Sequence, residues 1–290
     1  MWRKIWQKNL PQYKELRKKI LLQKIEDNMV EPYQNITPEL ASEIRLVMAD
    51  VDGTLTSSGD SISPSVSKAV HRLEEHGIIV GLVSGRTIPM LESLAKKLRI
   101  SGPIIAENGG VAKLKANGEL LDLDYSRQAA LKALERLKAK FPNRIKERED
   151  NRDRLVDVVF WSQGIQTEEL MKYLEDAQLL DSGYILHIMQ KGINKGKTLM
   201  RLLRLIGEGR LSPSEVLVVG DSTTDLSLFK LFPNSVLIPN PKLPTRDKEL
   251  LQNTARYVSD HPYGDGFAEV AMHVCDVRAC GMQLQNWSWG

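Results

Sequence analysis

Short apolar runs alternate with helix-like segments from about residue 44 onward. The apolar runs occupy 44–49, 78–83 and 104–106, and helical spacing of apolar residues fills 64–76 and the segment that ends at Leu98. Apolar runs of this length, separated by helices, are typical of parallel strands that are buried on both faces of a sheet. The sequence therefore predicts βαβ units and an α/β fold.

The alternation breaks between residues 111 and 190. Strand-like runs are expected at 111–114, 155–161 and 184–189, and helices at 126–140 and 167–179. From Asn194 the βα rhythm returns, with a helix to about Ile206, strands at 216–219 and 235–238, and helices at 224–231 and 265–273. This order predicts one α/β domain that is interrupted by an inserted α+β module.

The predicted domain boundaries follow from that change of pattern. We expect a core domain in two pieces, 44–110 and 191–275, an inserted cap domain at 111–190, an N-terminal extension at 1–43 and a C-terminal tail at 276–290.

The N-terminal extension is basic, and apolar residues are interleaved among its charges at loosely helical spacing. Such a segment can lie on a membrane surface or bind a partner. A helix that packs on the main body or on a second subunit is the interpretation we favour. Partner binding or self-association through this arm stays an open alternative.

Composition narrows the function classes. The net charge is only +3, which calls for neither nucleic acid nor a membrane as partner. No run approaches the roughly 20 apolar residues that cross a bilayer, and the first residues lack a secretory apolar stretch. Cys275 and Cys280 have neither zinc-site spacing nor a disulfide framework around them. We expect a cytoplasmic protein.

Two aspartates follow the first predicted strand, in the run DVDGTLT at 50–56. Oxygen donors of this kind suit Mg²⁺, and an aspartate beside a metal can attack phosphorus. Two neighbouring carboxylates can also divide their roles by protonation state. Asp50 and Asp52 are therefore candidates for catalysis and metal binding, although a turn after a strand would also use Asp and Gly.

Three further polar clusters follow in order. Ser84 and Gly85 come after the second strand and before a helix, where a hydroxyl and free N–H groups can hold a phosphate. Lys195 precedes the helix to Ile206 and can neutralise phosphate charge. Asp221 and Asp225 follow the strand at 216–219 and can hold a metal. Each cluster alone fits a turn or a helix cap, but their joint order favours a phosphoryl-transfer centre.

These clusters resemble the motifs of the haloacid dehalogenase (HAD) superfamily of phosphohydrolases, over roughly residues 44–275. The resemblance implies a Rossmann-like parallel-sheet core with a cap, and a Mg²⁺-dependent phosphatase of small phosphorylated metabolites. It makes Asp50 the nucleophile, which forms an aspartyl-phosphate, and Asp52 the general acid/base.

The resemblance also assigns the remaining site residues. The metal would be held by Asp50, the backbone carbonyl of Asp52 and Asp221, with Asp225 as a further ligand or a supporting residue. Ser84, Gly85 and Lys195 would bind the phosphoryl group.

An insertion between Ser84 and Lys195 matches the Cof-like branch, which has a large α/β cap, and ENG at 107–109 resembles a signature of that branch. The ending at 264–270, GDGFAEV, resembles archaeal-type phosphoglycolate phosphatases and sucrose-phosphate phosphatase relatives. Phosphoglycolate is therefore the first expected substrate and a sugar phosphate the second. Thr224 stands where this branch more often has Asn, which puts the details of metal or phosphate binding in doubt.

The cap is expected to set the substrate. Its basic candidates for binding a carboxylate or a second phosphate are Arg127, Arg144, Arg152 and Arg154. Cap motion would flex at Gly110 and at 191–192.

Three alternatives remain. A P-loop enzyme would use Gly196, Lys197 and Thr198, but the first glycine of that motif is missing at Lys191. A phosphomutase would share the phospho-aspartate step. A non-enzymatic scaffold would dock a partner through the N-terminal arm, although it has no need of clustered carboxylates.

Overall fold

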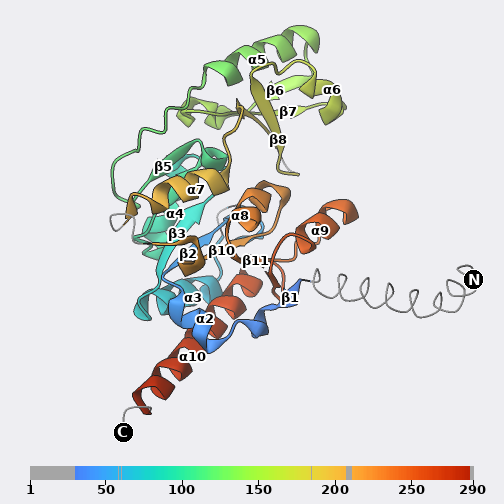
Figure 1. The fold of residues 1–290 in the computed structure, drawn as a ribbon. Helices are drawn as coiled ribbons and strands as arrows, with labels where there is room; N and C mark the ends of the chain where they lie inside the picture. The colour runs from blue at the N-terminus through green and yellow to red at the C-terminus, as the bar shows by residue number, and fades with distance from the viewer. Residues whose placement is uncertain (1–29, 58, 60, 184, 207–210, 288–290) are drawn as a thin grey trace, which may run out of the picture.

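A large α/β body carries a smaller module on one side in this computed structural model (Figure 1). The structure describes residues 30–57, 59, 61–183, 185–206 and 211–287. The body is built on an eight-stranded sheet. In spatial order its strands are β1 (Glu31–Pro32), β12 (Tyr257–Val258), β11 (Asn234–Leu237), β10 (Val216–Gly220), β2 (Leu46–Ala49), β3 (Ile79–Val83), β4 (Ile104–Ala106) and β5 (Val111–Lys113). Neighbouring strands are parallel, except that β5 is antiparallel to β4. The predicted α/β class is confirmed.

Helices cover both faces of this sheet. One face packs against α2 (Pro38–Glu43), α3 (Pro64–Glu75), α4 (Ile88–Leu98) and α10 (Tyr263–Trp287), and the other against α7 (Lys195–Leu203), α8 (Leu226–Leu231) and α9 (Thr245–Gln252). Successive residues of a strand point to opposite faces. In β2, Val47 and Ala49 join the first apolar cluster, whereas Leu46 and Met48 join the second. The burial of all four residues explains the continuous apolar run.

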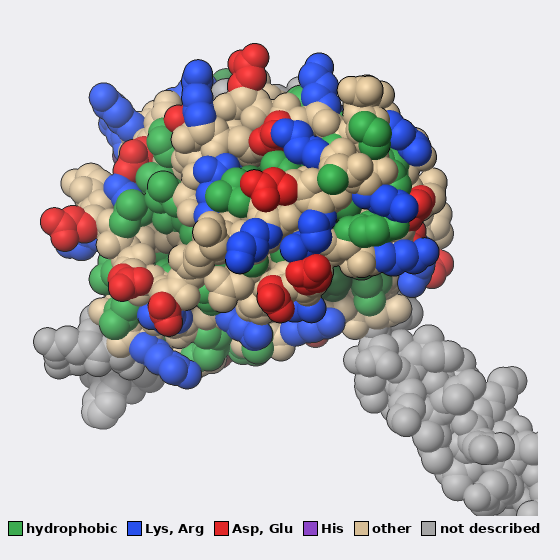
Figure 2. Space-filling view, turned by 90° about the horizontal axis from the view of Figure 1, so that it is seen from above, with side chains coloured by type: hydrophobic (Ala, Val, Ile, Leu, Met, Phe, Trp, Pro, Cys, Tyr) green, Lys and Arg blue, Asp and Glu red, His purple; other side chains and the backbone are tan. Residues whose placement is uncertain are grey.

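The inserted module is a four-stranded antiparallel sheet with helices on it. Its strands, in spatial order, are β6 (Ile145–Glu147), β7 (Val158–Ser162), β9 (Leu186–Gln190) and β8 (Ala177–Asp181), and its helices are α5 (Gln128–Lys140) and α6 (Thr167–Met171). Leu134 and Leu137 of α5 pack on Phe160 and Ile188 in a separate apolar cluster. Basic and acidic side chains are interspersed on the outward face of the molecule at this end (Figure 2).

The structure corrects several boundaries. Residues 30–43 were expected in the extension, but β1 pairs with β12, and Ile36 and Ala41 are buried in the main core. The strand at 111–113 was assigned to the cap, yet it completes the larger sheet by pairing with β4. The expected C-terminal tail is instead the last part of α10, which runs to Trp287. The guanidinium of Arg278 in this part donates to the carbonyls of residues 41, 42 and 44 and so holds the helix against α2 and the residue after it.

One predicted helix is wrong over half its length. The sequence predicted a helix at 167–179, but α6 ends at Met171 and residues 177–181 form β8. Glu175 takes a positive φ of 49° between the two elements, so a right-handed helix cannot continue through it to residue 179. The strand depends on pairing with β9, a contact that helical spacing does not reveal.

No helix in the described ranges is long and apolar enough to cross a membrane. The basic segment at 1–29 lies outside the described residues, so its interaction with a partner stays a prediction.

Candidate active site

Two aspartates meet at the carboxyl edge of the large sheet. Asp50 follows β2 and Asp221 follows β10, and these strands are paired neighbours, with Val219 opposite Ala49. Carboxylate oxygens of Asp50, Asp221 and Asp225 all lie within 4.8 Å of one another, and all three residues are buried. The structure therefore brings together three of the four predicted metal ligands.

Lys195 lies among these carboxylates. Its Nζ donates to Oδ1 of Asp50 at 2.9 Å, to Oδ1 of Asp225 at 2.7 Å and to Oγ1 of Thr224 at 3.0 Å. Asn194 caps α7 by accepting from the N–H of Lys197, which fixes the first turn and the direction of Lys195. Burial alone would lower the pKa of Lys195, but Asp225 and Asp50 outweigh it and raise that pKa. The carboxylates of Asp225 and Asp50 therefore favour the charged form of Lys195.

Asp225 supports its neighbours. Its Oδ1 accepts from Lys195, and its Oδ2 accepts from the backbone N–H groups of Asp221 and Ser222, both at 3.1 Å. Both oxygens thus have protein donors. Of the two roles expected for Asp225, the geometry favours the supporting one.

Thr224, at the position where Asn is usual, contacts two residues of the site through its hydroxyl. Its hydroxyl accepts from Lys195 and also bonds the Ser222 hydroxyl at 2.9 Å. Threonine therefore supplies an oxygen to the lysine in this chain.

Asp221 is held by two donors that precede and follow it in the sequence. Its Oδ1 accepts from Oγ1 of Thr54 at 3.2 Å, and its Oδ2 accepts from Nδ2 of Asn240 at 2.6 Å. Asn240 escaped the sequence analysis because it lies in a loop without a motif around it. Gly53 passes close by: a β-carbon at that position, whose φ is +90°, would lie 2.1 Å from Oδ2 of Asp221. Only glycine allows this approach.

The charge balance of this cluster suits a cation. Three buried carboxylates face one lysine. Burial raises the pKa of Asp50 to about 7, with Asp225 and Asp52 adding to the rise and Lys195 opposing it. Burial, Asp50 and Asp225 likewise raise the pKa of Asp221. A divalent ion among these oxygens would relieve the repulsion, and hard oxygen donors fit Mg²⁺.

Asp52 lies apart from the three carboxylates. Its side chain is 56% exposed and forms a two-pronged pair with the buried Arg86, whose Nε and Nη2 donate at 2.9 and 2.6 Å. Arg86 also donates to the carbonyl of Gly59 at 2.9 Å. The sequence analysis quoted Arg86 within its motif but gave it no role. The carboxylate of Asp52 is thus held by Arg86 on the exposed side of the site, outside the cluster of Asp50, Asp221 and Asp225.

Ser84 and Gly85 follow β3 and are clasped by the ENG segment at 107–109. The N–H of Asn108 donates to the carbonyl of Ser84, and the N–H of Glu107 to that of Arg86, both at 3.0 Å. Glu107 and Asn108 have φ values of 49° and 54°, which few residues adopt. This segment therefore fixes the backbone of the predicted phosphate-binding loop.

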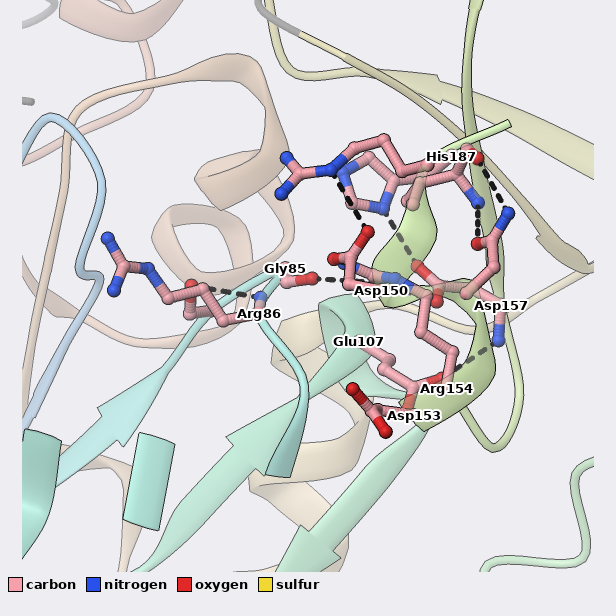
Figure 3. Close-up of polar contacts among 12 residues, drawn as sticks. Gly85, Arg86, Glu107, Asp150, Asp153, Arg154, Asp157 and His187 are labelled. Atoms are coloured by element: carbon pink, nitrogen blue, oxygen red, sulfur yellow. Dashed lines mark hydrogen bonds and ion pairs between the residues drawn. The ribbon is translucent and has the colours of Figure 1, made fainter. Parts of the chain in front are cut away.

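Glu107 also fastens the inserted module to the core. Its buried carboxylate accepts from the N–H groups of Leu155, Val156 and Asp157 at 2.8–2.9 Å. Figure 3 shows Glu107 and Asp157 of this contact. Burial, assisted by Asp157, raises the pKa of Glu107 to about 7. The sequence marked ENG only as a signature and gave no indication of this contact.

Arg154 is the expected cap arginine that reaches the core loop. Its Nη1 donates to the carbonyl of Gly85 at 3.0 Å. Arg127 and Arg144 donate to carbonyls within the module, and Arg152 pairs with Asp153 on its surface. Arg127 and Arg144 thus stabilise the cap, and Arg152 lies on its surface.

The GKT run is occupied by structural contacts. The hydroxyl of Thr198 donates to the carbonyl of Gly109 at 2.7 Å, and Lys197 is exposed. The lysine that enters the cluster is Lys195, so the geometry disfavours the P-loop alternative.

Comparison with known proteins agrees with this geometry. The sequence matches the haloacid dehalogenase-like hydrolase family over residues 47–151 and 126–270. Phosphoglycolate phosphatase of Methanospirillum hungatei is 30% identical over 231 residues, which cover 78% of this chain and 95% of that protein. Phosphoglycolate phosphatase of Methanothrix thermoacetophila is 31% identical over 245 residues, covering 82% and 99%.

Solved structures show the same fold. A Thermoplasma acidophilum protein has a TM-score of 0.68 and 28% identity, over 80% of this chain and 98% of that one. The sucrose-phosphatase of Synechocystis, at 17% identity and a TM-score of 0.61, covers 79% and 97% and shares the fold. The expected resemblance and enzyme class are confirmed: the chain is a hydrolase that belongs to the haloacid dehalogenase-like family.

Proposed function

We propose that this hydrolase is a Mg²⁺-dependent phosphatase that cleaves phosphoglycolate through an aspartyl-phosphate on Asp50. The observation that carries the proposal is the buried cluster of Asp50, Asp221 and Asp225 around Lys195. A phosphate monoester and three carboxylates would repel each other, so such a site requires positive charge. Lys195 supplies one charge, and Mg²⁺ bound by Asp50 and Asp221 would supply the remainder and neutralise phosphoryl oxygens.

The residues divide the work as follows. Oδ2 of Asp50, the oxygen that Lys195 leaves free, attacks phosphorus while the ester oxygen departs. Ser84 and the N–H groups of its loop hold the phosphoryl oxygens. Asp52 protonates the leaving oxygen and then accepts a proton from the water that attacks the aspartyl-phosphate. For that step Asp52 has to turn from Arg86 toward Asp50, and its exposed position leaves it room to do so.

The substrate assignment rests on relatives. This chain covers 95% and 99% of the length of the two phosphoglycolate phosphatases described above. A sugar phosphate is the second candidate, and its support is limited to the motif resemblance in the sequence. Hydrolysis to free phosphate separates either reaction from a phosphomutase.

The test is phosphate release from phosphoglycolate by the full chain, with Mg²⁺ and with EDTA. Asp50→Asn keeps the shape of the side chain and removes the nucleophile, so turnover is expected to fall at least about 10³-fold. Asp276→Asn, a change of an exposed carboxylate on α10, is the matched control and is expected to behave as wild type. The proposal would be contradicted if wild type kept its turnover in EDTA, or if Asp50→Asn turned over as fast as wild type.

A further inference from the structure

The inserted module places one histidine directly on the predicted phosphate-binding loop. His187 belongs to β9 and is buried. A β-carbon built on Gly85 would lie 3.1 Å from Cε1 of His187 and 2.9 Å from Nδ2 of Asn108. Figure 3 shows the contact between His187 and Asp157 in the same region as Gly85. A cap residue and a core residue thus converge on the same side of Gly85.

The ring of His187 is oriented by a buried pair. Its Nδ1 lies 2.8 Å from Oδ2 of Asp157, and Oδ1 of Asp157 accepts from Nη1 of Arg154 at 2.7 Å. Burial would raise the pKa of Asp157, but His187 and Arg154 outweigh it and lower that pKa. Asp157 is therefore a carboxylate that accepts a hydrogen bond from Nδ1–H. Nothing in the described part of the chain hydrogen-bonds Nε2 of His187.

Asn108 adds a second polar group without a partner. Its Nδ2 is buried and has no hydrogen-bond partner among the described residues. A buried amide N–H without an acceptor is unfavourable unless a ligand or water satisfies it. The backbone of Asn108 is held by Ser84 in the rare left-handed conformation, so the amide is kept in this place.

Two nitrogen groups without protein partners, set against the loop that holds the phosphoryl group, fit an anionic oxygen ligand. We propose that His187 and Asn108 bind the carboxylate of the substrate, which makes the enzyme selective for a short phosphorylated hydroxy acid. This inference rests on the proposed phosphatase function and deepens it. For both contacts the ring carries a proton on each nitrogen: Nδ1–H donates to Asp157 and Nε2–H donates to the substrate carboxylate, and both hydrogen bonds are charge-assisted.

The position of the pair limits the length of the substrate. Because His187 and Asn108 lie against Gly85 itself, the carboxylate and the phosphoryl group must be neighbours in the bound molecule. Glu107 fixes the position of Asp157, and through it that of His187, because its carboxylate accepts from the backbone N–H of Asp157. Arg154 ties the same segment to the carbonyl of Gly85.

The experiment compares two matched substrates, phosphoglycolate and ethyl phosphate, which differ by the carboxylate. The measured quantity is the ratio of their kcat/KM values, with the full chain and saturating Mg²⁺. In His187→Gln this ratio is expected to fall about 10- to 100-fold, because a charge-assisted hydrogen bond to the carboxylate is lost. His71→Gln removes an exposed histidine on α3 and is expected to leave the ratio unchanged.

A second variant tests the core half of the pair. Asn108→Asp keeps the side-chain shape and tolerates the left-handed backbone, but it places a carboxylate opposite that of the substrate. The ratio is expected to fall at least about 10-fold. If His187→Gln does not fold, this variant decides the question. An unchanged ratio in either folded variant overturns the proposal.

Wild type separates the two levels of inference. No phosphate release from either substrate would refute the phosphatase itself. Release from both with similar kcat/KM would leave the phosphatase intact and overturn carboxylate recognition by His187 and Asn108.

Discussion

Lys195 is the positive charge among the buried carboxylates of the described site, so replacing it with methionine tests the electrostatic reasoning. Methionine keeps much of the length of the side chain and removes its charge. The ion pairs to Asp50 and Asp225, at 2.9 and 2.7 Å, are almost fully shielded from solvent. Breaking a buried pair by removing one partner costs about 3–5 kcal/mol. That is a large part of the roughly 5–15 kcal/mol that stabilises a typical protein.

The loss should depend on pH in a defined direction. Without metal, burial raises the pKa of Asp50 to about 7. Between the unfolded value of about 3.9 and about 7, the native state holds a proton that the unfolded state has released, so stability falls as pH rises. Lys195 opposes the rise in the pKa of Asp50, so its removal extends that window to higher pH. The destabilisation by Lys195→Met is therefore expected to be larger at pH 8 than at pH 6.

Urea unfolding followed by circular dichroism, in EDTA at both pH values, measures this difference. Lys197→Met is the matched control, because Lys197 lies two residues further on and is exposed. It should change the free energy of unfolding by less than about 0.5 kcal/mol. If Lys195→Met were as stable as Lys197→Met at pH 8, the carboxylates would not depend on this lysine, and the electrostatic account of the site would be wrong.

Two other substitutions probe the backbone of the site. Gly53→Ala should abolish activity and lower the stability of the fold more than Gly77→Ala does. Both positions have positive φ, but only a β-carbon at Gly53 would meet Asp221. Thermal unfolding of the two variants measures the difference, and equal losses of stability would count against the close approach. Glu107→Gln should lower the free energy of unfolding by about 1–3 kcal/mol, since an amide cannot accept from all three N–H groups. Because the pKa of Glu107 is raised to about 7, wild type loses stability as pH rises toward 7. The difference in free energy of unfolding between wild type and Glu107→Gln should therefore narrow from pH 5 to pH 8. Urea titrations at both pH values measure it, and a constant or widening difference would contradict this reasoning.

The sequence by itself determined the framework of the core. Apolar runs alternate with helices, which is a local property that reflects burial on both faces of a parallel sheet. Parallel strands end at one edge, so polar residues that directly follow strands had to meet there. Asp50 and Asp221 were predicted as site residues for this reason and lie together in the structure, and Lys195, predicted from its position at the start of a helix, lies beside them.

Contacts between distant segments were decided only by the tertiary structure. Three contacts join different elements: the ion pair of Asp52 with Arg86, the hydrogen bonds of Glu107 to residues 155–157, and the close approach of His187 to Gly85. Strand β8 likewise formed where helical spacing predicted a helix, because its partner β9 is available only after folding. Local patterns record which face of an element is buried, whereas these pairings depend on how the inserted module docks on the core, and no periodicity within one segment encodes that.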